Sequence, residues 1–455
     1  MDKVFMRQEV LLGHLSSTPR TSSDLLCQQV SSSPCAASYE RTPEYSDDIV
    51  IVAAYRTPIC KAKRGGFKDA RPEDLLEPVL KAVVEKTGIR PDEVGDIVVG
   101  TVLAPGSQRA MECRVAAFLA GFPETVPIRT VNRQCSSGLQ AVADVASAIK
   151  SGYYNIGIGA GLELMSEHSI GWRRNDNPRV QTNQKARDCL IPMGITSENV
   201  AERYGVLREE QDEAAVRSHK NAQAATATGR FQDEIIPVHT QIVDPKTGNK
   251  TSVTISVDEG IRANTSMSSL SKLNPAFKKG GSTTAGNSSQ VSDGAAAVLL
   301  MRRAMAVTKG LPILGVFRSF AAVGCDPAVM GIGPAVAIPA AVEAAGLQIN
   351  DIDLYEINEA FASQYVYCCK KLGLDSEKVN VNGGAIALGH PLGVTGARCV
   401  GTLLHEMKRR GKDCRFGVVS MCIGTGMGAA AVFECGSDHL SNARSNTTNN
   451  LLSNV

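Results

Sequence analysis

Four short stretches of the sequence combine reactive side chains with glycines. Cys135 lies in VNRQCSSGLQA, ahead of an apolar, helix-like run, and Cys422 lies in SMCIGTGMG. Asn358 begins NEAFA, and His390 lies in NGGAIALGHPLGVTGAR. A cysteine at the start of a helix lies near unpaired N–H groups that favour its thiolate. Two thiols and a histidine suit acyl transfer: one thiolate attacks, the histidine accepts its proton, and the second thiol moves a proton on the substrate.

Each of these residues also has a structural interpretation. A cysteine is often a small buried hydrophobe, Asn358 is a suitable helix N-cap, and an isolated histidine is more often structural than catalytic. Around His390, however, glycines let the backbone approach a ligand closely. The sequence GTGMG after Cys422 resembles a dinucleotide-binding fingerprint, but that fingerprint must open a helix and this one leads into the strand-like AAAVFE.

Composition and charge exclude several other classes of protein. The chain has 455 residues, enough for two or three domains, and a formal net charge of +2. A nucleic-acid-binding protein needs a basic stripe, which this balance does not supply. No run of about 18 apolar residues predicts a membrane span. The thirteen cysteines lack C-x-x-C spacing, so we expect no metal site and mostly buried, reduced thiols.

A weak internal repeat predicts the elements that position the four residues. Strands alternating with helices indicate two similar α/β halves, each with a mostly parallel buried sheet. Because ligands bind at strand ends and in the loops after them, the two halves can bring the four residues into one pocket. The paired segments are 48–58 with 311–321, 75–100 with 337–358, 130–152 with 379–411, and 156–161 with 417–426.

The same pattern predicts the domain organisation. We expect a first half at 47–163 and 286–310 and a second half at 311–435. Residues 164–285 interrupt the first half and are too long for a structureless loop, so they form a subdomain. The Ser-rich segment 1–46 is expected to be a leader, and the Asn/Ser-rich segment 436–455 a disordered tail.

Taken together, the motifs resemble those of the thiolase family, and most closely its plant peroxisomal 3-ketoacyl-CoA thiolase branch. The resemblance covers about Asp48 to Glu434 and depends on NEAFA, GGAIALGHP and C-I-G in their required order. It implies a five-layered αβαβα core, built from two duplicated βαβαβαββ halves, with 164–285 as a loop domain over coenzyme A.

The resemblance also implies roles for the matching residues. Cys135 resembles the nucleophile that becomes S-acylated, and His390 the base that activates it. Cys422 resembles the acid/base that protonates or deprotonates the acetyl carbon. Asn358 would hold a water that, with His390, binds the thioester oxygen. The backbone N–H groups of Cys135 and Gly424 would form a second oxyanion hole.

Other positions follow from the same resemblance. Ser289 falls where the family contacts coenzyme A, and Met193 in PMGIT is expected to line the pocket. Leu164 and Val394 depart from the family pattern, and we expect both to reshape the acyl pocket. No cofactor or metal is expected, since coenzyme A is a substrate, and the family implies a homodimer.

The implied activity is thiolysis of 3-ketoacyl-CoA by coenzyme A in fatty-acid β-oxidation. One alternative is a biosynthetic acetoacetyl-CoA thiolase, and a second is a catalytically inactive lipid- or CoA-binding module with the same fold. The intact Cys135, Asn358, His390 and Cys422 argue against the inactive module. Turnover of acyl-CoA by the purified protein separates the three.

The leader contains RQEVLLGHL at 7–15, which resembles a type-2 peroxisomal targeting signal. Arg7 and Gln8, followed after five residues by His14 and Leu15, match that signal. On a helix Arg7, Leu11, His14 and Leu15 share one face, so a receptor can read two basic residues and an apolar ridge together. A mitochondrial presequence is the alternative, and acidic residues in the leader oppose it. We therefore expect import into peroxisomes (glyoxysomes) by the type-2 signal receptor, and family habit implies cleavage after Cys35.

A redox hypothesis concerns Cys189 in DCLIPMGIT, four residues before Met193. An activated thiolate is readily oxidised, and peroxisomes generate peroxide. A Cys135–Cys189 disulfide requires the two Cα atoms to approach within about 7 Å. The alternative is that Cys189 only packs.

Overall fold

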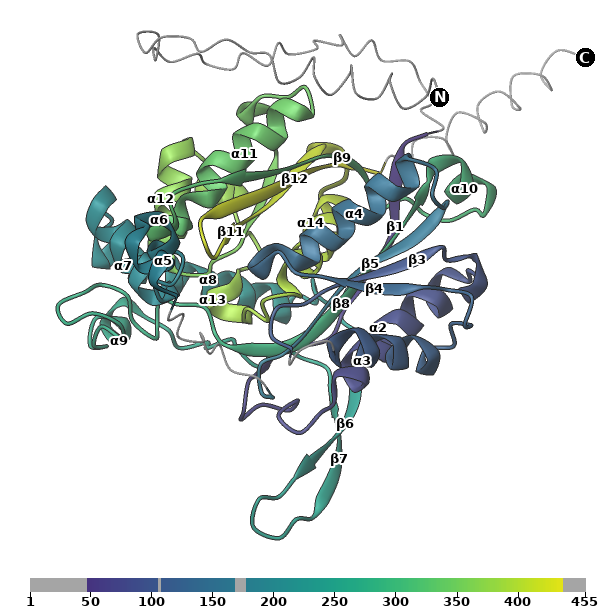
Figure 1. The fold of residues 1–455 in the computed structure, drawn as a ribbon, viewed down its shortest axis with the longest axis horizontal. Coiled ribbons are helices and arrows are strands. Elements are labelled where there is room, and N and C mark those ends of the chain that lie inside the picture. Colours follow the sequence, from purple (N-terminus) through teal and green to yellow (C-terminus); the bar gives the residue numbers. More distant parts are fainter. Residues whose placement is uncertain (1–46, 105–107, 168–176, 437–455) are drawn as a thin grey trace, which may run out of the picture. The chain divides into compact units, whose positions relative to one another are not determined.

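The computed structural model describes residues 47–104, 108–167 and 177–436. All of the predicted leader, including Arg7, Gln8, His14 and Leu15, therefore lies outside the described residues, as does the predicted tail beyond Gly436. The predicted α/β fold with two similar halves is confirmed (Figure 1).

The first half alternates strands and helices. The strands Ile49–Arg56, Asp96–Gly100, Ile156–Leu164 and Ser292–Arg302 are buried along nearly their whole length, which is why they read as continuous apolar runs. The helix α2 starts with Pro72, and it ends before Gly88, whose backbone is left-handed. Proline at the start and a left-handed glycine after the end are usual helix boundary signals. The elements are β1 (Ile49–Arg56), β2 (Cys60–Lys61), α2 (Pro72–Thr87), β3 (Asp96–Gly100), α3 (Gln108–Leu119), β4 (Ile128–Val131), α4 (Ser137–Lys150), β5 (Ile156–Leu164), β8 (Ser292–Arg302) and α10 (Arg303–Thr308).

The second half repeats the main alternation of strands and helices, but one of its strands is reduced. Where the first half has β4, the second half has a single parallel bridge between Tyr355 and Val379. The implied βαβαβαββ order is therefore complete in the first half and lacks one full strand in the second. The elements are β9 (Gly315–Gly324), α11 (Gly333–Ala344), β10 (Leu354–Ile357), α12 (Ala362–Leu372), α13 (Ala385–Leu388), α14 (Thr395–Arg410), β11 (Phe416–Ile423) and β12 (Met427–Cys435).

The strands of both halves form one continuous path in the order β10-β11-β12-β9-β1-β8-β5-β3-β4. The halves join where β1 and β9 pair through two residues of each strand. The expectation of a mostly parallel sheet is wrong: β3 pairs in parallel with β4 and β5, and β10 with β11, but the other pairs on this path are antiparallel. The short turn between β11 and β12 explains part of this, since only antiparallel strands can be joined so tightly.

Three hydrophobic clusters separate the layers of the core. The strands of each half form one β layer. The first cluster packs α2 and α3 on the outer face of the layer formed by the first half. The second cluster contains α4 and α14 between the two β layers, and the third packs α11 and α12 on the outer face of the layer formed by the second half. Side chains along β12 alternate, with Ala431 and Phe433 in the middle cluster and Ala430 and Val432 in the outer one. The layer order is therefore αβαβα, with α4 and α14 side by side in its centre (Figure 1).

The segment between β5 and β8 forms its own helices and a hairpin. Buried ion pairs hold it to β1: Arg56 contacts Glu234 at 2.6 Å and Asp258 at 2.7 Å. Its described elements are α5 (Pro178–Thr182), α6 (Gln184–Asp188), α7 (Met193–Tyr204), α8 (Arg208–Ala227), β6 (Val238–Val243), β7 (Lys250–Ile255) and α9 (Met267–Leu270).

One helical segment, Pro327–Ala344, is long and apolar enough to cross a membrane by length and composition. Within the fold it is a 3-10 turn followed by α11, and Val329 interrupts its helical backbone. Ala337, Ile338 and Ala341 pack in the core against the second sheet. Its apolar composition is therefore explained by its place as a core helix.

Candidate active site

Cys135 lies in a 3-10 turn, Gln134–Ser136, that leads directly into α4. Gln134 has a φ of 47°, which is uncommon for a residue with a side chain. Its N–H donates to Asn132 Oδ1, and its amide donates to Thr425 Oγ1 at 3.3 Å. Thr425, in the loop after Cys422, also has a positive φ of 69°. The turn that carries Cys135 and the turn that follows Cys422 are thus both strained and are joined to one another, as is common at functional sites.

Two glycines allow the second half to approach the start of α4. A Cβ on Gly138 would lie 2.7 Å from the carbonyl oxygen of Gly393 and 2.8 Å from the N of Ala397. A Cβ on Gly393 would lie 2.6 Å from the Cα of Thr101. Both contacts are with backbone atoms, so neither position tolerates a side chain. The turn that carries His390 is therefore pressed against the turn that carries Cys135.

Hydrogen bonds on both ring nitrogens orient His390. Nδ1 lies 2.6 Å from Thr395 Oγ1, and Nε2 lies 3.3 Å from Asn358 Nδ2. With Nδ1–H donating to Thr395, Nε2 is the acceptor of the ring. Burial and the positive charge of Arg398 lower the pKa of His390 to about 3. The imidazole is therefore neutral, which a general base requires.

Asn358 follows β10 and is almost fully buried. Its N–H donates to the carbonyl of Ser420, which ties it to β11. The N-cap interpretation is wrong, because α12 begins at Ala362 and its N-cap residue is Phe361. Among the described residues Asn358 Oδ1 has no hydrogen-bond partner. A buried amide oxygen in this state can accept a hydrogen bond from a bound molecule.

The two thiols lie close enough to influence one another. Burial raises the pKa of Cys422 well above its ordinary value, and Cys135 adds to this effect. Burial also raises the pKa of Cys135 to about 11, although the N–H groups of Gly424 and of Cys135 itself lower it. The N–H groups at the helix start thus favour the thiolate, but burial of the thiol outweighs them. Both cysteines are protonated at rest, and Cys135 needs a base.

An apolar wall lies beside Cys422. Met330 and Ala360 form a buried cluster with Cys422, and Met193 and Phe361 pack against it. Met193 Sδ also lies 3.4 Å from the position of a Cβ on Gly424, so the structure brings Met193 to the site.

Ser289 and Phe277 extend the surroundings of this wall. The N–H of Ser289 donates to the carbonyl of Ala360, which places Ser289 next to NEAFA. The ring of Phe277 meets that of Phe361 edge to face at 6.1 Å. Phe277 is partly exposed, as a residue that contacts a bound apolar group is expected to be.

The other predicted positions differ in their surroundings. Cys189 Sγ lies 3.7 Å from the carbonyl of Thr425, next to the Cys422 loop. Leu164 is buried in the outer cluster of the first half, and Val394 in the middle cluster. The expected effect of Leu164 and Val394 on the acyl pocket has no support here, because both side chains belong to the hydrophobic core.

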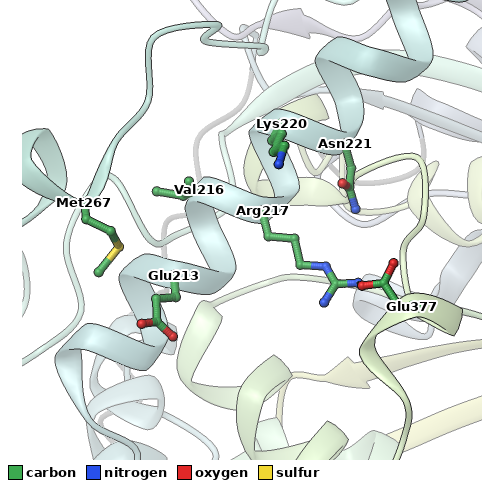
Figure 2. A pocket seen from close by; sticks show the side chains of 7 residues that line it. All are labelled: Glu213, Val216, Arg217, Lys220, Asn221, Met267 and Glu377. Carbon is green, nitrogen blue, oxygen red and sulfur yellow. The ribbon is translucent and has the colours of Figure 1, made fainter.

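A separate pocket of about 390 Å³ lies on the inserted segment (Figure 2). The guanidinium of Arg217 reaches the carboxylate of Glu377 across it, at 3.1 Å. None of the predicted site residues lines this pocket, so it is distinct from the site around Cys135. Its lining is Glu213, Val216, Arg217, Lys220, Asn221, Met267 and Glu377. Within 47–104, 108–167 and 177–436, no group of three or more His, Cys, Asp or Glu side chains is arranged to hold a metal ion.

Comparisons with known proteins agree with this geometry. Family models for the thiolase N-terminal and C-terminal domains match residues 49–304 and 311–435. The chain is 71% identical to 3-ketoacyl CoA thiolase 1, peroxisomal, of Petunia hybrida, over 100% of this chain and 99% of that protein. It is 68% identical to 3-ketoacyl-CoA thiolase 2, peroxisomal, of Arabidopsis thaliana, with the same coverage.

Solved structures show the same relationship. The dimeric peroxisomal thiolase of Saccharomyces cerevisiae matches with a TM-score of 0.78 and 46% identity, over 86% of this chain and 98% of that one. The acetyl-CoA acetyltransferase of Bacillus anthracis matches with a TM-score of 0.76 and 40% identity, over 86% and 99% of the two chains. The chain therefore belongs to the thiolase family.

Several residues of the site were not predicted from the sequence. Thr395 fixes the tautomer of His390, Gln134 joins the two thiol loops, and Phe277 and Phe361 border the apolar wall. Thr395 follows His390 by only five residues, so the turn GHPLGVT was a usable signal. Phe277 gave no such signal, because its contact with Phe361 joins residues far apart in the chain.

Proposed function

We propose that this chain is a peroxisomal 3-ketoacyl-CoA thiolase, which cleaves 3-ketoacyl-CoA with coenzyme A into acyl-CoA and acetyl-CoA. The observation that carries this proposal is a set of contacts between the halves: Cys135 lies near Cys422, His390 contacts Asn358, and the start of α4 packs against the turn after His390. The full-length identity to plant relatives named as peroxisomal 3-ketoacyl-CoA thiolases supports it. Nothing in the site favours a biosynthetic enzyme or an inactive module.

In the first step the Cys135 thiol passes its proton to His390 and the thiolate attacks C3 of the substrate. A thiol with a pKa of about 11 needs this base, and neutral His390 has Nε2 as its acceptor nitrogen. Thr395 holds the imidazolium that forms, as an orienting partner does for a catalytic histidine. The N–H groups of Cys135 and Gly424, which face the sulfur, are proposed to stabilise an adjacent oxyanion.

Cleavage of the C2–C3 bond leaves the enolate of acetyl-CoA and an acyl group on Cys135 Sγ. Cys422 is proposed to donate its proton to C2, and its raised pKa keeps that proton in place until it is needed. Asn358 Oδ1 and His390 are proposed to hold a water that binds the thioester oxygen.

Coenzyme A then enters as the second substrate. Its thiol passes a proton to Cys422 and attacks the acyl carbon, which releases acyl-CoA and returns the Cys135 thiolate to accept the proton of His390. We propose that residues 164–285 cover coenzyme A, with Ser289 and Met193 at its pantetheine end. Partly exposed Phe277 and Val291 give this side an apolar character that suits the carrier arm.

We further propose a homodimer formed through α3 and the edge strand β4. Met111, Val115, Phe118 and Leu119 are exposed on α3 at spacings that share one helix face. Apolar faces of this kind mark protein interfaces, and the peroxisomal thiolase of Saccharomyces cerevisiae, which has the same fold, is dimeric. A monomeric mass for the wild-type chain in light scattering would contradict this proposal.

Targeting and redox control complete the proposed function. Residues 1–46 are proposed to carry a reporter into peroxisomes through the type-2 signal receptor, and import of a His14→Asp fusion at the normal level would contradict this. We also keep the Cys135–Cys189 disulfide as a proposal, supported by the place of Cys189 beside Thr425. All the cysteines described are free thiols in this structure. Peptide mapping of oxidised protein without a Cys135–Cys189 peptide would contradict the pairing.

Turnover by the purified chain tests the central assignment. Incubation with coenzyme A and a 3-ketoacyl-CoA longer than acetoacetyl-CoA should yield acetyl-CoA and a shortened acyl-CoA. Activity restricted to acetoacetyl-CoA would instead indicate the biosynthetic enzyme, and binding without turnover would indicate the inactive module.

A further inference from the structure

Glu163, near the end of β5, is a fully buried carboxylate that accepts four hydrogen bonds. The N–H of Leu103 lies 2.9 Å from Oε1, and the hydroxyl of Thr101 lies 3.4 Å from the same oxygen. The N–H groups of Val102 and Gly393 each lie 2.9 Å from Oε2. Three of these donors belong to the first half, and the fourth belongs to the second.

The partners of Glu163 all act as donors, which fits an ionised carboxylate. Burial raises the pKa of Glu163, while the N–H groups and the guanidinium of Arg109 act in the opposite direction. A glutamine at this position has the same shape, but its NH₂ group would face N–H donors and lose an acceptor. The site therefore requires the carboxylate itself.

The two sides that Glu163 joins carry the nucleophile and the base. Thr101 N donates to Val131 O, at the end of the strand that leads into the Cys135 turn. On the other side, Gly393 follows His390 by three residues. Because Gly393 is packed closely against the backbone of Gly100 and Thr101, the His390 turn contacts the first half at a fixed place.

We propose that Glu163 is a positioning residue that holds the His390 turn against the segment leading to Cys135, and so fixes the distance over which the Cys135 proton passes. This inference rests on the proposed roles of Cys135 and His390. The charge of Glu163 raises the pKa of Cys135, which opposes thiolate formation. Glu163 therefore does not help to ionise Cys135. Its place beside the site is explained instead by the hydrogen bond through which it holds the His390 turn.

The variant Glu163→Gln tests this proposal without changing volume. Since misplacement of a catalytic group by about 1 Å costs about 100-fold, we expect kcat to fall about 100-fold while KM stays within about threefold. Loss of the Glu163 charge alone would lower the pKa of Cys135 and speed its alkylation by iodoacetamide. If Glu163 positions His390, alkylation should instead slow at neutral pH, and its pH profile should shift upward toward that of His390→Ala. Glu198→Gln is the matched control, because Glu198 is buried and accepts the N–H groups of Ser282 and Thr283. That control should leave the profile unchanged.

A double-mutant cycle separates positioning from a general loss of structure. If Glu163 acts through His390, Glu163→Gln should slow alkylation in the wild type and have no further effect in His390→Ala. Equal slowing in both backgrounds, or a wild-type profile in Glu163→Gln, would overturn the proposal. If His390→Ala itself leaves alkylation and turnover unchanged, the proposed site is wrong instead. If Glu163→Gln does not fold, Glu163→Asp is the second variant. It keeps the negative charge but moves the carboxylate oxygens away from their N–H donors, so we expect a partial upward shift in the pH profile of Cys135 alkylation.

Discussion

The two halves of the molecule use the same position for different chemistry. In the first half the turn before the inner helix α4 carries Cys135, and in the second half the turn before α14 carries His390. β4 precedes the first turn as a full strand, whereas only the Tyr355–Val379 bridge stands at that place in the second half. The repeat thus keeps the location of the candidate residue and changes its identity, so that the proposed nucleophile and the proposed base both lie at the central layer.

The halves also differ in how they fix their reactive residue. Cys135 is held by the strained Gln134 and by a hydrogen bond to the opposite thiol loop. His390 is held within its own half by Thr395 and Asn358, and the buried pair of Arg398 and Glu356 joins the same two elements, α14 and β10. The side chain of His390 is therefore oriented within its own half, although Glu163 of the first half bonds the turn that carries it. Cys135 depends on contacts from both halves.

The largest effect is expected from removal of the nucleophile. Cys135→Ala should lower kcat by at least about 10⁴-fold, because every later step needs the acyl-cysteine. Cys414→Ala, which removes a buried thiol before β11, is the control and should retain activity. Substantial thiolysis by Cys135→Ala would show that the reactive turn of the first half is not the one described here.

The second thiol should be separable from the first. Cys422→Ser is expected to lower C–C cleavage and exchange of the acetyl protons of acetyl-CoA by about 10³-fold. Some acylation of Cys135 from acetyl-CoA should survive, since His390 still activates the Cys135 thiol and solvent can protonate the coenzyme A that leaves. Proton exchange at the wild-type rate would make Cys422 structural.

A smaller effect is expected from a substitution at the close contact between the halves. Gly393→Ala should destabilise the fold by about 1–3 kcal/mol, because the new Cβ meets backbone that cannot withdraw. Gly401→Ala in α14 is the matched control: its Cβ would lie 3.6 Å from Ala54, so we expect a neutral or slightly stabilising change. Denaturant unfolding measures both, and equal stability of the two variants would contradict the described contact.

The smallest effect concerns acid stability. Burial lowers the pKa of His390 to about 3 and that of His219 to about 4. Between pH 6.5 and these values the unfolded chain binds protons that the folded chain does not, so stability falls as pH falls, by at most about 1.4 kcal/mol per pH unit for each histidine. His390→Asn should flatten this slope, whereas exposed His239→Asn should not. Unfolding curves at pH 4.5 to 7 decide this.

The sequence patterns predicted the architecture of the chain better than they predicted the pKa values of its site residues. Apolar periodicity and the repeat placed Cys135 before a helix and His390 in the equivalent turn, because these signals are local. The link from Glu163 to Gly393 spans 230 residues and leaves no local pattern. The raised pKa of Cys135 was missed because burial depends on what packs over the turn. The antiparallel β11–β12 pair was readable from its short glycine turn but was assigned to a mostly parallel sheet.

The most direct test of the account is the identity of the acylated residue. Wild-type protein mixed briefly with acetoacetyl-CoA, quenched in acid and digested, should give a peptide with an acetyl group on Cys135, and the adduct should disappear when coenzyme A is added before the quench. An adduct found only on Cys422 or on another cysteine would contradict the assignment of the nucleophile to the first half.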